Sequence, residues 1–502
     1  MQIAQAIGEL NLIAAVKIAV VSCGLHQVIG DEDLNPSMAT ALGPCGVIPR
    51  EFSNITCFNV DLTRARESNG LNENHHRWVL SEFISPVAGE AVAYRGSHRW
   101  RRKFLPVALP SPLPSLHRNK SPGPDRLRER GVYLITGGTG GIGLAVARHL
   151  GQTCRARIVL TKKHSFPEKS RWKDLALRPD TAPEIAQTLR QLIEIESLGA
   201  EVEIMVADTS DREAMSAVFT ATRARFQTIH GVIHAAGIVR AGLVQTKTRD
   251  LAESVMAPKV AGTWILHDLL ADVELDFLVL FSSITSVTTP FAESDYSGAN
   301  AFLDAFAHFS RTRRPYPVIS IDWPGWKEAG QLADLKSAPG TEHWKESALK
   351  KAILTCDGVE AFRRALAAGL PQVVVSPTDL DAEMRQSEIA ARPAPVAESE
   401  IAKPSAEIED VVAEIWRTTF GLGQIGIHEQ FTSIGGHSLL ALQIVARLRS
   451  FYRMDLSLRD FFEAPTIAGL SSVIRDRIIR DIESLSDDEV RELIAKELET
   501  HD

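Results

Sequence analysis

Residues 132–143 read Val-Tyr-Leu-Ile-Thr-Gly-Gly-Thr-Gly-Gly-Ile-Gly. The run from Val132 to Ile135 is apolar and rich in β-branched side chains, which predicts a buried parallel strand. Residues 144–150, after the glycines, have the pattern of a helix. Glycines in such a turn let the backbone lie against a diphosphate, whose charge is favoured by the N–H groups of the helix N-terminus. The stretch indicates a dinucleotide site, with an ordinary glycine-rich turn as the alternative.

Composition excludes several classes of protein. The 502 residues predict roughly three or four domains, and the net charge of −8 gives no indication of a nucleic-acid partner. The basic run 99–103 is better explained as a solvated strand edge than as a nucleic-acid patch. Five scattered cysteines form no Cys-x-x-Cys pair, so no metal site is indicated. The most apolar stretch, residues 10–25, is too short to span a bilayer and follows no signal peptide, which predicts a cytoplasmic protein without a membrane segment.

The strand after the glycines indicates which dinucleotide would bind. Residues 156–160 form the next apolar run, and the position after it is where an acidic residue would hold the ribose 2′-hydroxyl of NAD. The sequence there is Thr161-Lys162-Lys163-His164, which contains no acid. Two lysines suit a 2′-phosphate, so NADP is favoured over NAD, although solvated loop lysines would give the same pattern.

Further strands alternate with helical segments. Apolar runs at 201–206, 231–234 and 277–281 are followed by Asp208, by Ala235-Ala236-Gly237 and by Ser282-Ser283, respectively. This alternation predicts an α/β fold with a doubly wound, parallel Rossmann-type sheet, which binds its ligands at the carboxyl ends of the strands. We therefore expect His234, Gly237 and Ser283 to lie along that edge.

Three more residues accompany this edge. Tyr296 opens a helical segment in which Asn300 lies one turn later on the same face. Lys259 stands at the start of another helix. Taken one at a time, a buried tyrosine and a surface lysine are the simpler explanations.

Together with residues 136–143 and 234–237, these side chains resemble the short-chain dehydrogenase/reductase superfamily. More narrowly, the set is similar to the ketoreductase domain of modular polyketide synthases. In that group lysine and asparagine exchange the places that they have in most of the superfamily, and Lys259 and Asn300 follow the exchanged order. The Gly30-Asp31-Glu32 and 39–50 stretches resemble the degenerate, non-catalytic subdomain of the same ketoreductases, which is shortened here at its N-terminus.

The resemblance implies a role for each site residue. Tyr296 would donate a proton to the substrate oxygen, and Lys259 would lower the tyrosine pKa and bind the nicotinamide ribose. Ser283 would hydrogen-bond the substrate oxygen, and Asn300 would position Lys259 and a relay water. Residues 328–352 would form a substrate lid. The implied cofactor-binding residues are Thr136, Gly137, Gly138, Thr139, Gly140, Gly141, Ile142, Gly143, Lys162, Lys163, Asp208, Ala235, Ala236, Gly237, Pro324 and Gly325.

The C-terminal part predicts a small four-helix bundle. Ser438 in Gly-Gly-His-Ser-Leu (435–439) opens a helix, and no neighbouring base in the pattern would make it a hydrolase nucleophile. A serine at a helix N-terminus is suited to carry a phosphodiester. The motif resembles the phosphopantetheine attachment site of acyl and peptidyl carrier proteins, although Ser433 stands where that family usually has Asp or Glu. A plain capping serine is the alternative.

These patterns predict an order of domains. The expected parts are a degenerate structural subdomain (1–104), a Pro-rich linker (105–130), a catalytic ketoreductase (131–378), a second linker (379–405), a carrier domain (406–480) and a C-terminal helix (481–502), which could dock a partner.

The function implied by the resemblance is NADPH-dependent reduction of a β-ketoacyl thioester that is tethered through 4′-phosphopantetheine on Ser438. The implied partners are the carrier-bound substrate, upstream and downstream synthase modules and a phosphopantetheinyl transferase, without nucleic acid or membrane. Two alternatives remain: a carrier module with a silent reductase scaffold, and a free-standing NADP-dependent dehydrogenase with a helical tail.

Overall fold

The structure is a computed structural model. It describes residues 1–10, 12, 14–52, 54–63, 73–84, 91–109, 126–334, 348–389, 407–420, 424–431, 434, 438–452, 454, 456 and 458–483. The chain folds as two compact units. The first consists of Met1–Leu335 and Glu346–Ser387, and the second of Lys336–Lys345 and Glu388–Asp502.

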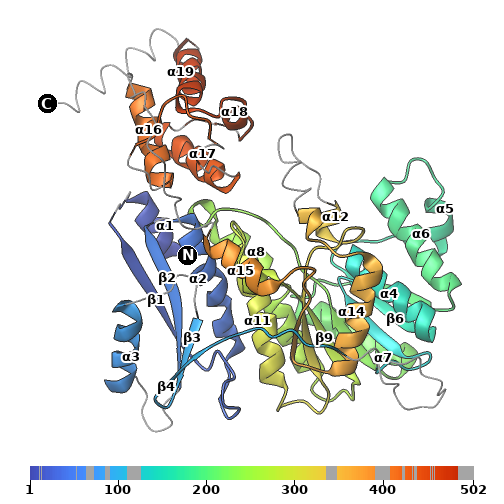
Figure 1. The fold of residues 1–502 in the computed structure, drawn as a ribbon. Coiled ribbons are helices and arrows are strands. Elements are labelled where there is room, and N and C mark those ends of the chain that lie inside the picture. Colours follow the sequence, from blue (N-terminus) through green and yellow to red (C-terminus); the bar gives the residue numbers. More distant parts are fainter. Residues whose placement is uncertain are drawn as a thin grey trace. The chain divides into compact units, whose positions relative to one another are not determined.

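The larger sheet of the first unit is parallel throughout, and its strand order is β11-β10-β9-β8-β5-β6-β7 (Figure 1). From β5 outward, the strands follow in chain order as β6 and β7 on one side and as β8, β9, β10 and β11 on the other. This is the arrangement of a doubly wound fold. The predicted fold class is confirmed. The strands are β5 (Val132–Thr136), β6 (Arg157–Lys162), β7 (Glu201–Val206), β8 (Gly231–His234), β9 (Phe277–Ser283), β10 (Val318–Trp323) and β11 (Gln372–Val374).

Helices cover both faces of this sheet because its strands are apolar on both sides. Along β5, Tyr133 and Ile135 belong to one hydrophobic cluster, whereas Val132 and Leu134 belong to another. The first cluster includes residues of α4 (Gly141–Cys154), α6 (Pro183–Ser197) and α14 (Thr355–Ala368). The second includes residues of α7 (Arg212–Phe226), α9 (Val260–Leu269) and α11 (Ser294–Ser310).

Shorter helices fill the connections between these elements. They are η2 (Lys169–Arg171), α5 (Trp172–Leu175), η3 (Val244–Thr246), α8 (Arg249–Met256), α10 (Thr285–Thr288) and α12 (Gln331–Asp334). A further helix, α15 (Leu380–Ile389), lies where the sequence predicted the start of a linker at residue 379.

The N-terminal part contains a second, smaller sheet in the order β1-β2-β3-β4. The first three strands are parallel and β4 pairs antiparallel with β3. All four residues of β4 are exposed, in agreement with the predicted strand edge at 99–103. The helices and strands of this N-terminal part are α1 (Gln2–Glu9), β1 (Val16–Cys23), η1 (Pro36–Ala41), α2 (Leu42–Glu51), β2 (Ile55–Leu62), α3 (Glu73–Ile84), β3 (Ala91–Arg95) and β4 (His98–Arg101).

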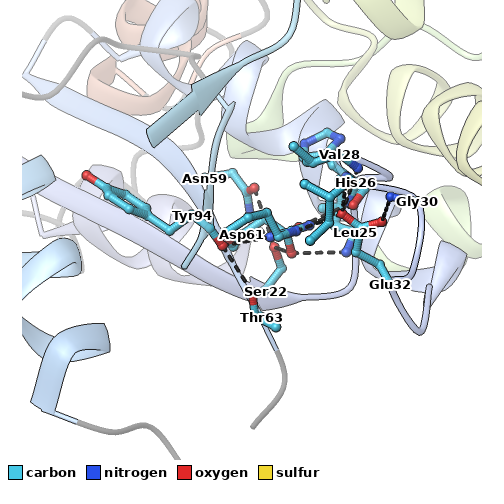
Figure 2. Close-up of polar contacts among 12 residues, drawn as sticks. Ser22, Leu25, His26, Val28, Gly30, Glu32, Asn59, Asp61, Thr63 and Tyr94 are labelled. Carbon is cyan, nitrogen blue, oxygen red and sulfur yellow. Dashed lines mark hydrogen bonds and ion pairs between the residues drawn. The ribbon is translucent and has the colours of Figure 1, made fainter. Parts of the chain in front are cut away.

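The carboxyl edge of this smaller sheet is occupied by the chain's own carboxylates (Figure 2). Asp61, next to the end of β2, accepts hydrogen bonds from the backbone N–H groups of Leu25 and His26 and pairs with Arg95 at 2.7 Å. Glu32 pairs with the same arginine at 3.0 Å and accepts hydrogen bonds from three N–H groups of residues 28–30.

Glu32 therefore occupies a nest of backbone donors of the kind that binds anions. Burial opposes its ionisation, but the backbone donors and Arg95 lower the pKa of Glu32 to about 2. The carboxylates of Glu32 and Asp61 thus take up the backbone donors that a phosphate would need at this edge.

The second unit is helical, as predicted for the carrier segment. Its core contains Trp416, Phe431 and Phe461, whose ring centroids lie 4.8–5.8 Å apart. Its described helices are α16 (Glu407–Phe420), α17 (Ser438–Tyr452), α18 (Leu458–Glu463) and α19 (Ile467–Glu483). The expected tail helix, from residue 485, lies outside the described residues.

Candidate active site

The glycine turn between β5 and α4 is closely packed against neighbouring backbone. Gly137 has φ +63°, and a Cβ there would lie 2.8 Å from Cα of Ala236. A Cβ on Gly143 would lie 2.9 Å from Cα of Gly138. Gly140 is the N-cap of α4, so the free N–H groups of Gly141 and Ile142 follow it at the helix N-terminus. The turn is a cradle that side chains would fill, which suits a diphosphate.

Gly330 is a neighbour of this turn that sequence reasoning missed. It has φ +81°, and a Cβ on Gly141 would overlap its backbone nitrogen. The segment after β10 therefore passes directly beside the start of α4. No local sequence pattern connects Gly141 with Gly330, because the two residues lie far apart in the chain. The only hint in the sequence was the pair of small residues at 329–330.

The ends of β5 and β8 meet through two polar contacts. Ala235 N–H donates to Thr136 O at 3.1 Å, and the Thr136 hydroxyl lies 2.6 Å from His234 Nδ1. Burial and the nearby Lys259 lower the pKa of His234 to about 3, so its ring is neutral at physiological pH. His234 thus holds two strand ends together, and Ala236 and Gly237 continue from this junction beside the glycine turn.

The two lysines at the end of β6 take different positions: Lys162 is its last residue and Lys163 follows it. Lys163 pairs with Asp208 at 2.7 Å, which joins two residues predicted to bind the cofactor. Burial opposes ionisation of Asp208, but hydrogen bonds from Lys163 and Ser210 lower its pKa. Lys162 lies with Nζ 5.1 Å from the ring centroid of Phe166. Both lysines stand at the carboxyl end of β6, where a 2′-phosphate is predicted.

The four predicted catalytic residues come from three elements. Tyr296 and Asn300 lie one turn apart on α11, Ser283 ends β9, and Lys259 is the N-cap of α9. Lys259 Nζ lies 5.7 Å from the centroid of the Tyr296 ring, and the polar side chains of Ser283 and Asn300 favour the ionised form of its phenol. The Asn300 amide also donates to Tyr296 O at 2.8 Å. The structure therefore brings all four together at the carboxyl edge of the sheet.

The expected lowering of the Tyr296 pKa by Lys259 is not found. Burial and the carboxylate of Glu293 raise the pKa of Tyr296 to about 12, against the opposing effect of Asn300 and Ser283. Lys259 faces the ring of the tyrosine and donates a 2.6 Å hydrogen bond to Phe281 O. Its ammonium is thus held by the backbone of β9, and burial lowers the pKa of Lys259 to about 8.

Other predicted positions are only partly described. Pro324 and Gly325 follow β10, and Gly325 O accepts a hydrogen bond from Ile353 N. Of the expected lid at 328–352, the structure describes residues 328–334, which include α12, and 348–352; residues 335–347 lie outside the described part of the chain. Ser438 is the first residue of α17, but its side chain and residues 435–437 lie outside the described part, as does Ser433. Among the described residues, no group of His, Cys, Asp and Glu side chains could hold a metal ion.

Comparison with known proteins finds two matching domain families. The KR domain family matches residues 131–328, and the phosphopantetheine attachment site family matches residues 410–474. The chain is 31% identical to polyketide synthase PksL of Bacillus subtilis over 316 residues, 62% of this chain and 6% of that protein. It is 27% identical over 463 residues to a component of the phenolphthiocerol/phthiocerol polyketide synthase of Mycobacterium tuberculosis, 91% of this chain and 23% of that one.

A ketoreductase from the first module of phoslactomycin biosynthesis in Streptomyces is structurally similar. Its TM-score is 0.61 at 26% identity, covering 78% of this chain and 83% of that one. The chain therefore spans a small part of these curated relatives but most of a solved ketoreductase.

The fold, the site and the two family matches together define an α/β oxidoreductase that is followed in the chain by a carrier domain. More narrowly, residues 131–328 match the KR domain family and residues 410–474 the phosphopantetheine attachment site family, as in the polyketide synthases to which the chain is similar, and the cofactors of these domains are NADPH and 4′-phosphopantetheine. The described part of the chain contains no helix that is both long and apolar enough to cross a membrane.

Proposed function

We propose that this chain uses NADPH to reduce a β-ketoacyl thioester to the β-hydroxyacyl thioester, with the acyl chain tethered through phosphopantetheine on Ser438. The observation that carries the proposal is the convergence of Tyr296, Ser283, Asn300 and Lys259 at one point of the sheet edge. The proposal includes a ketoreductase over residues 131–378 and a carrier over 406–480, with upstream and downstream modules and a phosphopantetheinyl transferase as partners.

The proton transfer follows from the environment of Tyr296. A phenol whose pKa is raised to about 12 stays protonated at neutral pH and can donate its proton. The substrate oxygen becomes negative as the carbonyl is reduced, so it takes the proton while the phenol becomes a phenolate. Ser283 and Asn300 favour the ionised form of Tyr296 and so lower the cost of that step.

The cofactor region has the features that NADPH requires. The glycine turn at the start of α4 is open to a diphosphate because its Cβ positions are empty, and Lys162 and Lys163 offer charge for a 2′-phosphate. When bound, NADPH supplies the hydride that reaches the β-carbon of the substrate.

The test is NADPH oxidation with a β-ketoacyl thioester of N-acetylcysteamine, measured at 340 nm for the full chain and for Tyr296→Phe. We expect the wild type to oxidise NADPH and the variant to lose on the order of 10²–10⁴-fold in rate while it still binds NADPH. Equal turnover by both proteins would refute the role of Tyr296. Absence of NADPH binding by the wild type would favour the silent-scaffold alternative.

A further inference from the structure

The loop between β8 and α8 is docked on the smaller sheet's subdomain. Val244, in η3 of this loop, is fully buried in a hydrophobic cluster whose other buried members all lie within residues 4–57. Gln5 of α1 donates from Nε2 to the carbonyl oxygens of Val244 and Lys247, each at 2.8 Å. Apolar packing and two hydrogen bonds therefore fix the position of this loop from outside the catalytic sheet.

The segment that leads into α11 rests on the same subdomain. A Cβ on Gly43 of α2 would overlap Ser294 O, and a Cβ on Gly46 would overlap the side chain of Thr289. Ala292, between these two contacts, has φ +63°, which is strained for a residue other than glycine, so the surrounding structure must hold it. Both loops are thus positioned by the smaller sheet's subdomain.

Glu51, the last residue of α2, joins the two loops to each other. Its buried carboxylate accepts a hydrogen bond from Val244 N through Oε2 at 2.5 Å and one from Ala292 N through Oε1 at 3.1 Å. Gly242 N also donates to Ala292 O at 2.8 Å. A backbone N–H that is removed from water is costly without an acceptor, so the geometry of both loops depends on this carboxylate.

A second link lies three residues further along each loop, where Lys247 pairs with Asp295. Nζ and Oδ1 lie 2.6 Å apart, and both side chains are fully buried. The same carboxylate oxygen accepts a 2.8 Å hydrogen bond from Tyr296 N–H, and Lys247 also donates to Arg240 O at 3.1 Å. Together with Glu51, these two side chains form a buried charged cluster that is attached to the backbone of the catalytic tyrosine.

Stability alone is a weak explanation for this cluster. A buried ion pair can often be replaced by apolar side chains of similar size at no cost in stability, because the desolvation of the two charges offsets their attraction. What the cluster provides is a fixed geometry: two links between one loop and the start of α11, the second of them at Tyr296 N–H.

We propose that Glu51 and the Lys247–Asp295 pair are positioning residues of the reduction, which clamp the loop after β8 to the start of α11 and so hold the Tyr296 phenol where it reaches the substrate oxygen. The inference rests on the proposed function for its effect on turnover. The three side chains act through the backbone, at Ala292 N–H and Tyr296 N–H. Displacement of a reacting group by about 1 Å can cost on the order of 10²-fold in rate, so turnover is sensitive to this clamp.

The test uses two changes in the full chain. Glu51→Gln keeps the shape of the side chain but offers one acceptor oxygen in place of two. The double variant Lys247→Met with Asp295→Leu replaces the ion pair by apolar side chains of similar size. Glu9→Gln is the matched control, since it makes the same change at an exposed residue of α1 in the same subdomain.

Four quantities are measured for each variant. They are kcat and KM for NADPH-dependent reduction, the dissociation constant of NADPH, the midpoint of thermal unfolding and the ¹⁹F spectrum of the chain labelled with 3-fluorotyrosine. The Tyr296 signal among the five tyrosines is assigned with Tyr296→Phe. The spectrum reports the surroundings of the phenol whether or not a substrate is present.

We expect Glu51→Gln and the double variant to lower kcat roughly 10- to 100-fold and to shift or broaden the Tyr296 signal, with NADPH binding nearly unchanged. The double variant should unfold near the wild-type temperature, and Glu9→Gln should match the wild type in every measurement. Wild-type kcat and an unmoved Tyr296 signal in either variant would overturn the inference. A loss of kcat that is matched by equal losses of NADPH binding and thermal stability would also overturn it, since that result is a purely structural role. If the wild type lacks Tyr296-dependent turnover, the proposed function fails, and the ¹⁹F signal still decides whether the clamp positions Tyr296.

Discussion

Gly43 and Gly298 lie at a crossing where α2 of the smaller sheet's subdomain and the catalytic helix α11 touch backbone to backbone. A Cβ on Gly43 would overlap the backbone nitrogen of Gly298, and a Cβ on Gly298 would overlap the carbonyl oxygen of Thr40. Gly298 stands midway between Tyr296 and Asn300. The subdomain without a cofactor therefore packs directly against the segment that carries the proton donor.

The first prediction follows from this crossing. Gly298→Ala should lower the free energy of unfolding by about 1–3 kcal/mol. The added methyl group would meet backbone atoms, which cannot move aside as a side chain does by changing its rotamer. Gly151→Ala is a matched control within α4, since its nearest neighbour would be Ala200 Cβ at 3.3 Å. Thermal unfolding and NADPH oxidation should both show a loss for Gly298→Ala only; equal behaviour of the two variants would contradict the tight crossing.

Local patterns predicted much of the fold and site. The strand, glycines and helix at 132–150 follow one another in the chain, and Tyr296 and Asn300 share a helix face, so their relationship depends on spacing alone. The strand ends that carry Ser283 and His234 meet because parallel strands bring their carboxyl ends to one edge.

The charged cluster around Tyr296 was not accessible to the same reasoning. Glu51 contacts Val244 and Ala292, which are 193 and 241 residues away along the chain, and no periodicity joins such positions. The pKa of Tyr296 was predicted in the wrong direction for the same reason, because burial and Glu293 are features of the folded protein. The carboxyls close to Tyr296 at 293 and 295 were the only available signal.

The second prediction concerns cofactor choice. Replacing Lys162 by glutamate should weaken NADPH binding roughly ten- to hundredfold and leave NADH nearly unchanged, since a charge-assisted hydrogen bond to phosphate contributes about 1.5–3 kcal/mol. Lys163→Glu should act in the same direction and also break the pair with Asp208. Fluorescence titration of both nucleotides measures the ratio, with Lys173→Glu on the exposed surface of α5 as control. Parallel losses for NADPH and NADH would mean that neither lysine contacts the 2′-phosphate.

The third prediction concerns a buried pair of carboxyl groups behind the site. Burial and the neighbouring carboxyl of Asp304 raise the pKa of Asp322 well above its usual range, so Asp322 keeps its proton in the folded protein. Asp304 also accepts from Ser320 at 2.7 Å, and Asp322 from Gln372 at 2.7 Å.

The sign of the effect follows from proton binding. The folded protein keeps this proton at pH values where the unfolded chain has released it, so stability falls as pH rises above the unfolded pKa of about 4. Asp322→Asn can keep the hydrogen bond from Gln372 and cannot titrate. We expect it to raise the free energy of unfolding on the order of 1 kcal/mol at pH 8 and by less at pH 5. Urea unfolding at pH 5 and pH 8 measures this change, with Asp268→Asn as an exposed control. A lower free energy of unfolding for Asp322→Asn at both pH values would show that the carboxyl group itself is required.

The last prediction concerns the carrier. Ser438 opens α17, a helix of 15 residues, where the unpaired N–H groups of the first turn favour a negatively charged phosphodiester. Incubation of the full chain with coenzyme A and a phosphopantetheinyl transferase should add one phosphopantetheine to the wild type and none to Ser438→Ala. Intact-protein mass spectrometry measures the addition, and peptide mapping identifies its position.

Ser472, on the exposed face of α19, gives the control Ser472→Ala, which should be modified like the wild type. Modification of Ser438→Ala would move the attachment site elsewhere. A wild type without modification, even though the enzyme modifies an unrelated carrier in the same mixture, would contradict the tethering step and leave the ketoreductase chemistry to act on free thioesters.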